Sequence, residues 1–308
     1  MSGCDKKKDL IRAKALELGF SACGFARADR VCDEAVGRYK DWLGCGKNDC
    51  MDYAANYQEL RNDPRELFPG TKTVISVALN YYPTRFQSKD APQFSYYAYG
   101  RDYHDVVKVR LKALAEYIRQ NWDEESRVCV DTAPVMEKYW AREAGVGMIG
   151  RNNLLIIPGK GSFFFLGELL TTLEVEPDEP CTDSCGNCMQ CVKACPGGAL
   201  KDERFLDARR CLSCQLIERR GELPEWVVEV VGNRIYGCDE CQVACPHNKN
   251  AVSTRVVDFA PQDEFMELTI DKILSMDKAD FMRLFGKSAI RRAKLEGLLR
   301  NARIVKHN

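Results

Sequence analysis

Ten of the sixteen cysteines in this 308-residue chain lie between Cys181 and Cys245. Seven of these form two runs that each end in a proline: a complete CxxCxxCxxxCP run, and a second run that lacks its first cysteine because Ile235 stands there. This spacing is typical of bacterial-type iron–sulfur motifs. We therefore predict an electron-transfer module with two [4Fe-4S] clusters. The first run contains Cys185, Cys188, Cys191 and Cys195, and the second contains Cys238, Cys241 and Cys245.

In such motifs the fourth cysteine of each run binds the cluster of the other run. Cluster two then has three assigned thiolates and needs one more. Only Cys211 and Cys214 lie in the segment between the runs, and we prefer Cys211. The ligands predicted for cluster one are Cys185, Cys188, Cys191 and Cys245, and those predicted for cluster two are Cys195, Cys238, Cys241 and Cys211.

Two other uses of the cysteines are less favoured. Cysteine pairs at this spacing also suit structural zinc sites, but zinc has no use for three cysteines in successive CxxC steps plus a crossing fourth. Disulfides are disfavoured because the start, MSGCDKKKDL, is charged and has no apolar core region, unlike a secretory signal. We therefore expect a cytoplasmic protein. The cysteines outside the predicted ligand sets, such as Cys50 and Cys181, are expected to pack as small buried residues.

Composition indicates a soluble globular chain. Hydrophobic residues make up 45% of it, and 45 basic residues balance 45 acidic ones. No apolar stretch approaches the roughly eighteen residues of a membrane span, so we expect no membrane partner. Residues 281–308, however, carry eight basic side chains against Glu296 alone. This segment could grip a phosphate backbone, or it could be the solvated face of a helix whose leucines pack inward, and the sequence favours neither.

Helices and strands alternate in the first 175 residues. The apolar periodicity predicts helices at 6–18, 103–121 and 134–144, and strands at 20–26, 73–80, 126–131, 153–157 and 162–173. We read this part as an α/β or mixed α+β domain that ends at the linker of residues 174–180. Gly145, Gly147 and Gly150 spell GxGxxG, but a helix precedes them and a strand follows. Because a dinucleotide site requires the opposite order, nicotinamide binding there is disfavoured.

Asp131 is the carboxylate best placed for chemistry, because it ends a predicted strand and precedes a helix, where ligands bind in α/β sheets. It could equally cap that helix, as could Thr132. Glu137 and Glu143 are expected on an exposed helix face. His104 and His247 are too isolated in sequence to be nominated as ligands, so a cobalamin held by a protein histidine is not indicated.

Several segments together resemble the epoxyqueuosine reductase family, and the similarity runs almost end to end. Members of that family have a cobalamin-binding catalytic domain followed by a ferredoxin-like domain with two [4Fe-4S] clusters, an architecture similar to that of reductive dehalogenases. Their reaction removes the epoxide oxygen of epoxyqueuosine at the wobble position of tRNA. The matching segments are LRNDPRELFPG (60–70), GRDYHDVV (100–107), VDTAPVMEKYWAREAGVGMIGRNNLL (130–155), the first cysteine run (185–196), LDARRCLS (206–213) and GNRIYGCDECQVACPHNK (232–249).

The resemblance implies roles for individual residues. It favours Cys211 over Cys214, since Cys211 stands in the matching DARRC, and it makes Asp131 the proton donor. We expect Asp131 to be protonated near neutral pH, because a carboxyl beside an apolar corrin face would be desolvated. Met148 and Arg151 depart from the family's tryptophan and lysine, and we expect no counterpart in these 308 residues to the helical repeats of longer members. The resemblance also places Arg61, Asp131, Asn153, Leu155 and Ser213 at the cobalamin.

The expected organisation is α+β. It comprises an N-terminal α/β cobalamin-binding catalytic domain (1–176), a ferredoxin-like domain (177–250) and a basic C-terminal helical segment (251–308). The implied partners are the anticodon region of queuosine-family tRNA and an unidentified low-potential electron donor, and we expect a monomer. Two other functions remain open: a cobalamin-dependent reductase of a small molecule, and a non-catalytic iron–sulfur electron carrier.

Overall fold

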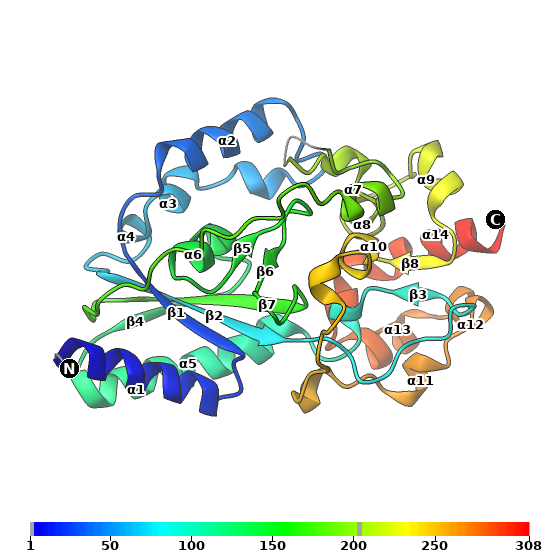
Figure 1. The fold of residues 1–308 in the computed structure, drawn as a ribbon. Coiled ribbons are helices and arrows are strands. Elements are labelled where there is room, and N and C mark those ends of the chain that lie inside the picture. Colours follow the sequence, from blue (N-terminus) through cyan, green and yellow to red (C-terminus); the bar gives the residue numbers. More distant parts are fainter. Residues whose placement is uncertain (1–2, 202–204, 308) are drawn as a thin grey trace.

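A four-stranded sheet forms the centre of the N-terminal half. The computed structural model describes residues 3–201 and 205–307 (Figure 1). The sheet order is β1-β2-β7-β4, and every neighbouring pair in it is antiparallel. The α+β class is therefore confirmed, whereas the α/β description of this half is wrong, because its helices do not connect paired parallel strands. The strands are β1 (Ala22–Arg27), β2 (Thr73–Asn80), β4 (Ser126–Cys129) and β7 (Phe164–Thr171).

Helices cover both faces of this sheet, which explains the nearly unbroken apolar sequence of β2. Helices α1 (Gly3–Glu17) and α5 (Tyr103–Trp122) lie on one face, where Leu111 packs with Ile75 of β2. Helix α6 (Glu137–Glu143) lies on the other face, where Trp140 packs with Val74 (Figure 1). Strand β2 is buried along almost all of its length, as a strand between two helical layers must be.

Two predicted elements around Asp131 are shorter than expected. Strand β4 ends at Cys129, and α6 begins only at Glu137. Asp131 itself has a φ of 49°, in the left-handed region, so an extended strand cannot continue through it. The remaining elements of this half are α2 (Asp33–Gly44), α3 (Gln58–Asn62), α4 (Pro64–Leu67), β3 (Gln93–Phe94), β5 (Met148–Ile149) and β6 (Leu155–Ile156).

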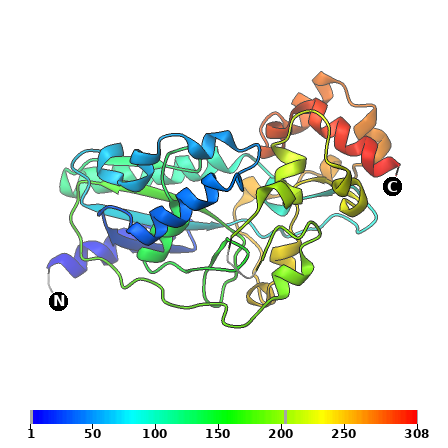
Figure 2. The ribbon, with the colours of Figure 1, turned by 90° about the horizontal axis from the view of Figure 1, so that it is seen from above.

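Short helices surround a small strand in the C-terminal half. Strand β8 (Arg234–Tyr236) pairs in parallel with β3, so the segment around residue 93 belongs structurally to this half of the molecule. Figure 2 shows the two halves side by side, with α14 at the end far from the N-terminus. The helices are α7 (Gln190–Ala194), α8 (Leu212–Ile217), α9 (Glu225–Val230), α10 (Glu240–Val243), α11 (Asp263–Met266), α12 (Ile270–Leu274), α13 (Lys278–Phe285) and α14 (Lys294–Lys306).

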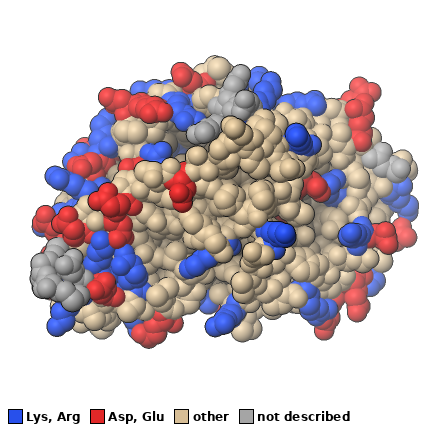
Figure 3. Space-filling view, viewed as in Figure 1, with Lys and Arg blue, Asp and Glu red and all other residues tan. Residues whose placement is uncertain are grey.

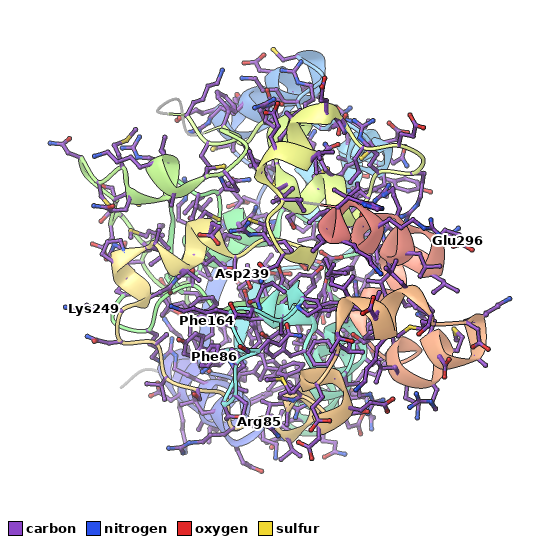
Figure 4. All side chains as sticks on the ribbon, turned by 90° about the vertical axis from the view of Figure 1, so that its right-hand side faces the viewer. Arg85, Phe86, Phe164, Asp239, Lys249 and Glu296 are labelled. Carbon is purple, nitrogen blue, oxygen red and sulfur yellow. The ribbon has the colours of Figure 1, made fainter. Side chains whose placement is uncertain are left out.

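Asp239 ties the inserted segment to this half. It is half-buried and lies between Cys238 and Cys241 in the sequence, and its carboxylate accepts a hydrogen bond from the Tyr96 N–H at 2.8 Å. Burial raises the pKa of Asp239 to about 6. Figure 4 shows Asp239 in the middle of the view, with Glu296 of α14 at the surface.

The C-terminal segment is part of the folded core. Leu298 and Ala302 of α14 are fully buried, and Asn301 donates to the Leu216 carbonyl of α8 at 3.0 Å and to the Ile235 carbonyl of β8 at 2.8 Å. The expectation that leucines of this segment pack inward is therefore confirmed for Leu298. Removing residues 283–308 would expose this core, so such a truncation cannot serve as a test of RNA binding.

Five of the eight basic residues in this segment have partners among the described residues of the protein, and one of the five is Arg291, which donates to the Gly286 carbonyl at 3.5 Å. Arg283 pairs with Glu264, Arg292 with Glu218 and Lys306 with Asp271, while Arg300 donates to backbone carbonyls. Both signs of charge are interspersed around the face seen in Figure 3, and its middle is mainly uncharged. Among the described residues, no helix is long and apolar enough to cross a membrane.

Candidate iron–sulfur and acid–base site

The predicted ligands of cluster one gather around one cavity. It is lined by Cys185, Cys188, Cys191 and Cys245, together with residues 151–152 and 156 of the β5–β6 region. The Arg151 N–H points at Cys185 Sγ, 3.4 Å away, and the Arg151 guanidinium donates to the Cys188 and Gly186 carbonyls at 3.0 Å each. Arg151 thus holds the loop that carries two ligands, and N–H groups aimed at sulfur stabilise thiolate charge.

The predicted ligands of cluster two also lie close together. Burial raises the pKa of Cys241 well above its ordinary value, and the neighbouring Cys238, Cys211 and Cys195 raise it further. The Ala199 N–H lies 3.2 Å from Cys195 Sγ. These four half-buried side chains would repel one another as thiolates, so they ionise readily together only when a metal binds them, as an iron–sulfur cluster does.

Cys214 points elsewhere. Its Sγ lies 3.8 Å from that of Cys50, next to Asp49, whose carboxylate is bound by Arg219 at 2.9 and 3.0 Å. Cys50 is half-buried and Cys214 is buried, as the packing interpretation of these two residues expects.

A chain of hydrogen bonds surrounds Asp131. His104 Nε2 lies 3.0 Å from Asp131 Oδ2, and His104 Nδ1 lies 2.7 Å from Asp102 Oδ1. The Asp131 N–H donates to Glu137 Oε1 at 2.5 Å. Helix α6 has no side-chain cap at its first turn, so the prediction that Asp131 or Thr132 caps it is wrong. The left-handed backbone of Asp131 instead turns its carboxylate towards the histidine.

These contacts determine where protons reside. Although burial raises the pKa of Asp131, the hydrogen bond and charge of His104 outweigh it, so the pKa is lowered. The expectation of a protonated Asp131 concerns a carboxyl beside a bound corrin face and stays a prediction; in the protein alone, His104 favours the ionised form. Burial lowers the pKa of His104, but its bonds to Asp102 and Asp131 prevail and raise it to about 9. Burial, followed by the charge of Asp131, raises the pKa of Glu137 to about 8.

Glu137 does not lie on an exposed face as predicted. It is half-buried, because its carboxylate turns back to the Asp131 backbone. Glu143 is also half-buried, and it pairs with Arg142 at 2.6 Å. Beneath Glu137 lies Glu168 of β7, which is fully buried and whose hydrogen bond is with Ser76 Oγ at 3.3 Å. Burial raises the pKa of Glu168 well above its ordinary value.

An aromatic ring and a guanidinium stand beside this acid–base group. The charge of Asp131 contributes to raising the pKa of Tyr53, after burial and Glu218, which places these residues near one another. The Arg292 guanidinium lies 5.5 Å from the centre of the Tyr53 ring and 2.6 Å from Glu218. Tyr53 is 48% exposed, so it offers a stacking surface at the edge of the site.

Comparison with known proteins identifies the family. Residues 61–132 match the family described as epoxyqueuosine reductase QueG, DUF1730, and residues 184–248 match a 4Fe-4S double cluster binding domain. The epoxyqueuosine reductase of Cellulophaga algicola is 38% identical over 99% of this chain and 100% of its own length. This chain belongs to the epoxyqueuosine reductase family. The reductases of Gloeobacter violaceus and Escherichia coli are 43% and 38% identical, over 95% and 97% of this chain and 93% and 80% of theirs.

Solved epoxyqueuosine reductases share the fold. A crystal structure with a tRNA-Tyr epoxyqueuosine-modified stem loop superposes with a TM-score of 0.89 at 30% identity, covering 98% of this chain and 81% of that one. A structure of the Bacillus subtilis enzyme has its catalytic aspartate loop swung out of the active site. It superposes with a TM-score of 0.88 at 29% identity, over 98% of this chain and 82% of that one.

The residues that the family resemblance placed at a corrinoid lie on several elements of the N-terminal half and on α8. Arg61 is on α3 and donates weakly to the Asn56 carbonyl, at 3.4 Å. Asn153 has a left-handed backbone, and its carbonyl accepts from Lys138 Nζ at 2.8 Å. The Leu155 side chain is buried in the core, so only its backbone can face a ligand. Ser213 is half-buried on α8.

Sequence reasoning about this reductase missed His104, Glu137, Tyr53 and Arg292. His104 stands in the family-like segment GRDYHDVV, which is the one signal that could have nominated it. Nothing in the local sequence marks Tyr53 or Arg292, because each acquires its neighbours only when distant segments fold together.

Proposed function

We propose that this protein reduces epoxyqueuosine to queuosine at the wobble position of tRNA, the last step of queuosine synthesis. The observation that carries the proposal is the Asp131 carboxylate, held on a strained backbone by His104, in a chain that belongs to this family. Strained residues of this kind are kept where the surrounding structure needs them, commonly at active sites.

The two clusters are proposed to deliver electrons. Cluster one would be held by Cys185, Cys188, Cys191 and Cys245, and cluster two by Cys195, Cys211, Cys238 and Cys241. The close packing of each thiol group supports these sets. An unidentified low-potential donor would reduce them, and the chain would act as a monomer of three parts (1–176, 177–250 and 251–308).

Cobalamin is the proposed catalytic cofactor, and the protein offers groups that fit an amide-rich ring. The buried Asn62 amide donor, next to Arg61, has no hydrogen-bond partner among the described residues, and ligand carbonyls satisfy such donors. Both ring nitrogens of His104 are already hydrogen-bonded, so this residue would not ligate cobalt. When bound, the cofactor supplies a strongly reducing centre for the C–O bond. Arg61, Asn153, Ser213 and the Leu155 backbone would hold it.

Asp131 is proposed as the group that passes a proton to the departing oxygen. As the C–O bond breaks, negative charge accumulates on oxygen, and an acid within hydrogen-bond reach stabilises it. Two electrons and two protons release the oxygen as water and leave the ring double bond of queuosine. Asp131 is exposed enough to meet a nucleotide, and its carboxylate is fixed in direction by His104.

The tRNA would be held largely through its phosphates. Among the described basic residues of the C-terminal segment, Lys287, Lys294 and Arg303 have no ion-pair partner. Free cations at the surface bind a phosphate backbone and make the affinity depend on salt. Tyr53, with Arg292 beside it, is placed to stack on a base that leaves the anticodon loop.

The decisive experiment is anaerobic reconstitution with iron, sulfide and cobalamin, followed by reduction in the presence of epoxyqueuosine-containing tRNA. Mass analysis of the digested nucleosides should show the loss of one oxygen, dependent on cobalamin. Conversion without cobalamin, or no conversion by fully loaded protein, would overturn the proposal. The variant Asp131→Asn should retain both clusters and cofactor while single-turnover conversion falls by about 100-fold, a typical contribution of one general acid. Unchanged rates in this variant would refute the role of Asp131.

A further inference from the structure

The proposed reaction consumes protons, yet Asp131, the residue proposed to pass a proton to the substrate, is ionised in the protein alone. The bond to His104 lowers the pKa of Asp131, so near neutral pH its carboxylate is ionised. An ionised carboxylate accepts protons and cannot donate one. A second group must therefore transfer a proton to the Asp131 carboxylate as the reaction proceeds.

The Tyr103 hydroxyl and the His104 ring both contact the Asp131 carboxylate. Burial raises the pKa of Tyr103 far above its ordinary value, which leaves His104 as the group that can give up a proton. Its Nε2 lies 3.0 Å from Asp131 Oδ2, within proton-transfer distance, and its Nδ1 is fixed by Asp102 at 2.7 Å. The ring also stacks on Tyr103, with centroids 4.2 Å apart and planes 26° apart. Asp102 is itself anchored, because it caps α5 by accepting the His104 N–H at 3.1 Å. The imidazole is thus fixed by Asp102 at one nitrogen, by Asp131 at the other and by the Tyr103 ring at its face, with its Nε2 directed at Asp131.

The charges around His104 favour its protonated form. The two bonded carboxylates outweigh the effect of burial and raise its pKa to about 9. Other groups act on the same network from different elements: Arg291 and Arg292 lower the pKa values of Asp102 and Asp131, whereas Glu137 adds negative charge. Burial lowers the pKa of Lys138, on α6, and the charges of Glu137 and Asp131 raise it.

We propose that His104 is a positioning and proton-relay residue that orients Asp131 and recharges it with a proton during reduction. This inference rests on the proposed function, since the proton acceptor is the departing epoxide oxygen. The Nε2–H bond of the imidazolium breaks as a proton moves to Asp131 Oδ2, and Asp131 passes that proton to oxygen. His104 becomes neutral and regains a proton from solvent. The relay therefore moves protons only and supplies no electrons.

Asp102 makes the relay testable without touching substrate. Asparagine caps helices as well as aspartate does, so Asp102→Asn should preserve α5 while removing one of the two negative charges on His104. The His104 pKa should then fall, because one of the two carboxylates that raise it is gone. The pH above which single-turnover conversion declines should fall by the same amount. If His104 had only a structural role, the pH above which conversion declines would be the same in Asp102→Asn as in the wild type.

The experiment compares His104→Gln, Asp102→Asn and the control His307→Gln, an exposed histidine near the C-terminus. Pre-reduced, fully loaded enzyme is mixed with epoxyqueuosine stem loop over a range of pH, so that electron supply does not limit conversion. We expect His104→Gln to lower the rate by about 100-fold at pH 8, with unchanged iron content and stem-loop affinity. His307→Gln should behave like the wild type. A His104→Gln variant with the wild-type rate and pH profile would overturn the inference.

A readout without turnover separates this inference from the proposed function. The chain has three histidines, so nitrogen NMR of the imidazoles in the cluster-loaded protein can be assigned by difference with His104→Gln. We expect His104 to titrate well above its ordinary pKa and to shift downwards in Asp102→Asn. A midpoint near the ordinary value of roughly 6.5 would overturn the relay even if epoxyqueuosine is reduced. If the wild type fails to convert epoxyqueuosine, the proposed function falls whatever the histidine does.

Discussion

The fourth ligand of cluster two can be identified by replacing Cys211 and Cys214, one at a time, with serine. Cys211 precedes α8 and faces the other three thiols, whereas Cys214 lies inside α8 with its Sγ 3.8 Å from Cys50. We expect Cys211→Ser to lose cluster two and Cys214→Ser to keep it. Since each cluster contains four irons, anaerobically reconstituted protein should hold about four irons in the first variant and about eight in the second.

Cys214→Ser should destabilise the cluster-free protein more than Cys211→Ser does. Loss of cluster two in Cys211→Ser could then not be explained by unfolding of the protein. Residue 211 is the N-cap of α8, and serine is among the best N-cap residues, so Cys211→Ser should not weaken this helix itself. Cys214 is buried, so a serine hydroxyl there should cost about 1–3 kcal/mol. Iron and sulfide assays, with electron paramagnetic resonance of the reduced protein, measure the clusters, and thermal unfolding of the cluster-free protein measures stability. About eight irons in Cys211→Ser together with about four in Cys214→Ser would refute the assignment.

Two further predictions concern buried charge and RNA affinity. The folded-state pKa of Glu168 is raised, so this residue binds a proton in the folded protein that the unfolded chain releases, and stability should fall as pH rises above the ordinary glutamate pKa. Glu168→Gln should therefore narrow the difference in unfolding temperature between pH 5 and pH 8, and an unchanged difference would contradict the buried neutral carboxyl. The triple variant of Lys287, Lys294 and Arg303 to glutamine should bind stem-loop RNA more weakly and with a shallower dependence on salt, measured by fluorescence anisotropy. An unchanged salt slope would place the RNA contact elsewhere.

The gathering of the proposed cluster cysteines into two groups could be predicted because their pattern is local in sequence. Metal geometry dictates short spacings between thiolates, and the proline after each run marks where the chain turns to the other cluster. Even the missing ligand left only two candidates between the runs. Where ligand spacing is fixed by metal geometry, candidate ligands can be listed from the sequence alone.

The acid–base group could be predicted only in part, because its members meet through the fold. Strand and helix periodicity placed Asp131 between two elements, but not on a left-handed backbone facing α5. Glu137 follows the pattern of a solvated helix face, yet the reversed chain at Asp131 covers it. The sequence suggests desolvation of Asp131, which raises its pKa, but it does not reveal that His104 from a distant segment lowers it. Charges contributed by distant segments are not encoded in any local pattern.

The pairing of β3 with β8 could not be predicted from the sequence either. Each strand has two or three residues, too few for an alternating pattern, and they come from opposite halves of the chain. The domain division drawn at residue 176 follows the composition of the linker, whereas the segment around residue 93 folds with the C-terminal half. Parallel pairing between distant segments has no signature in either of them.

The bridge made by Asn301 bears on the order in which the protein can be assembled. Its amide holds α8, next to Cys211, against β8, which leads to Cys238. During synthesis every proposed cluster ligand leaves the ribosome before α14, so the thiols of cluster two exist first without the helix that closes their scaffold. Before α14 docks, these thiols are therefore more open to iron and sulfide than in the folded chain, where the four side chains are half-buried and loading must take place through the remaining exposed surface.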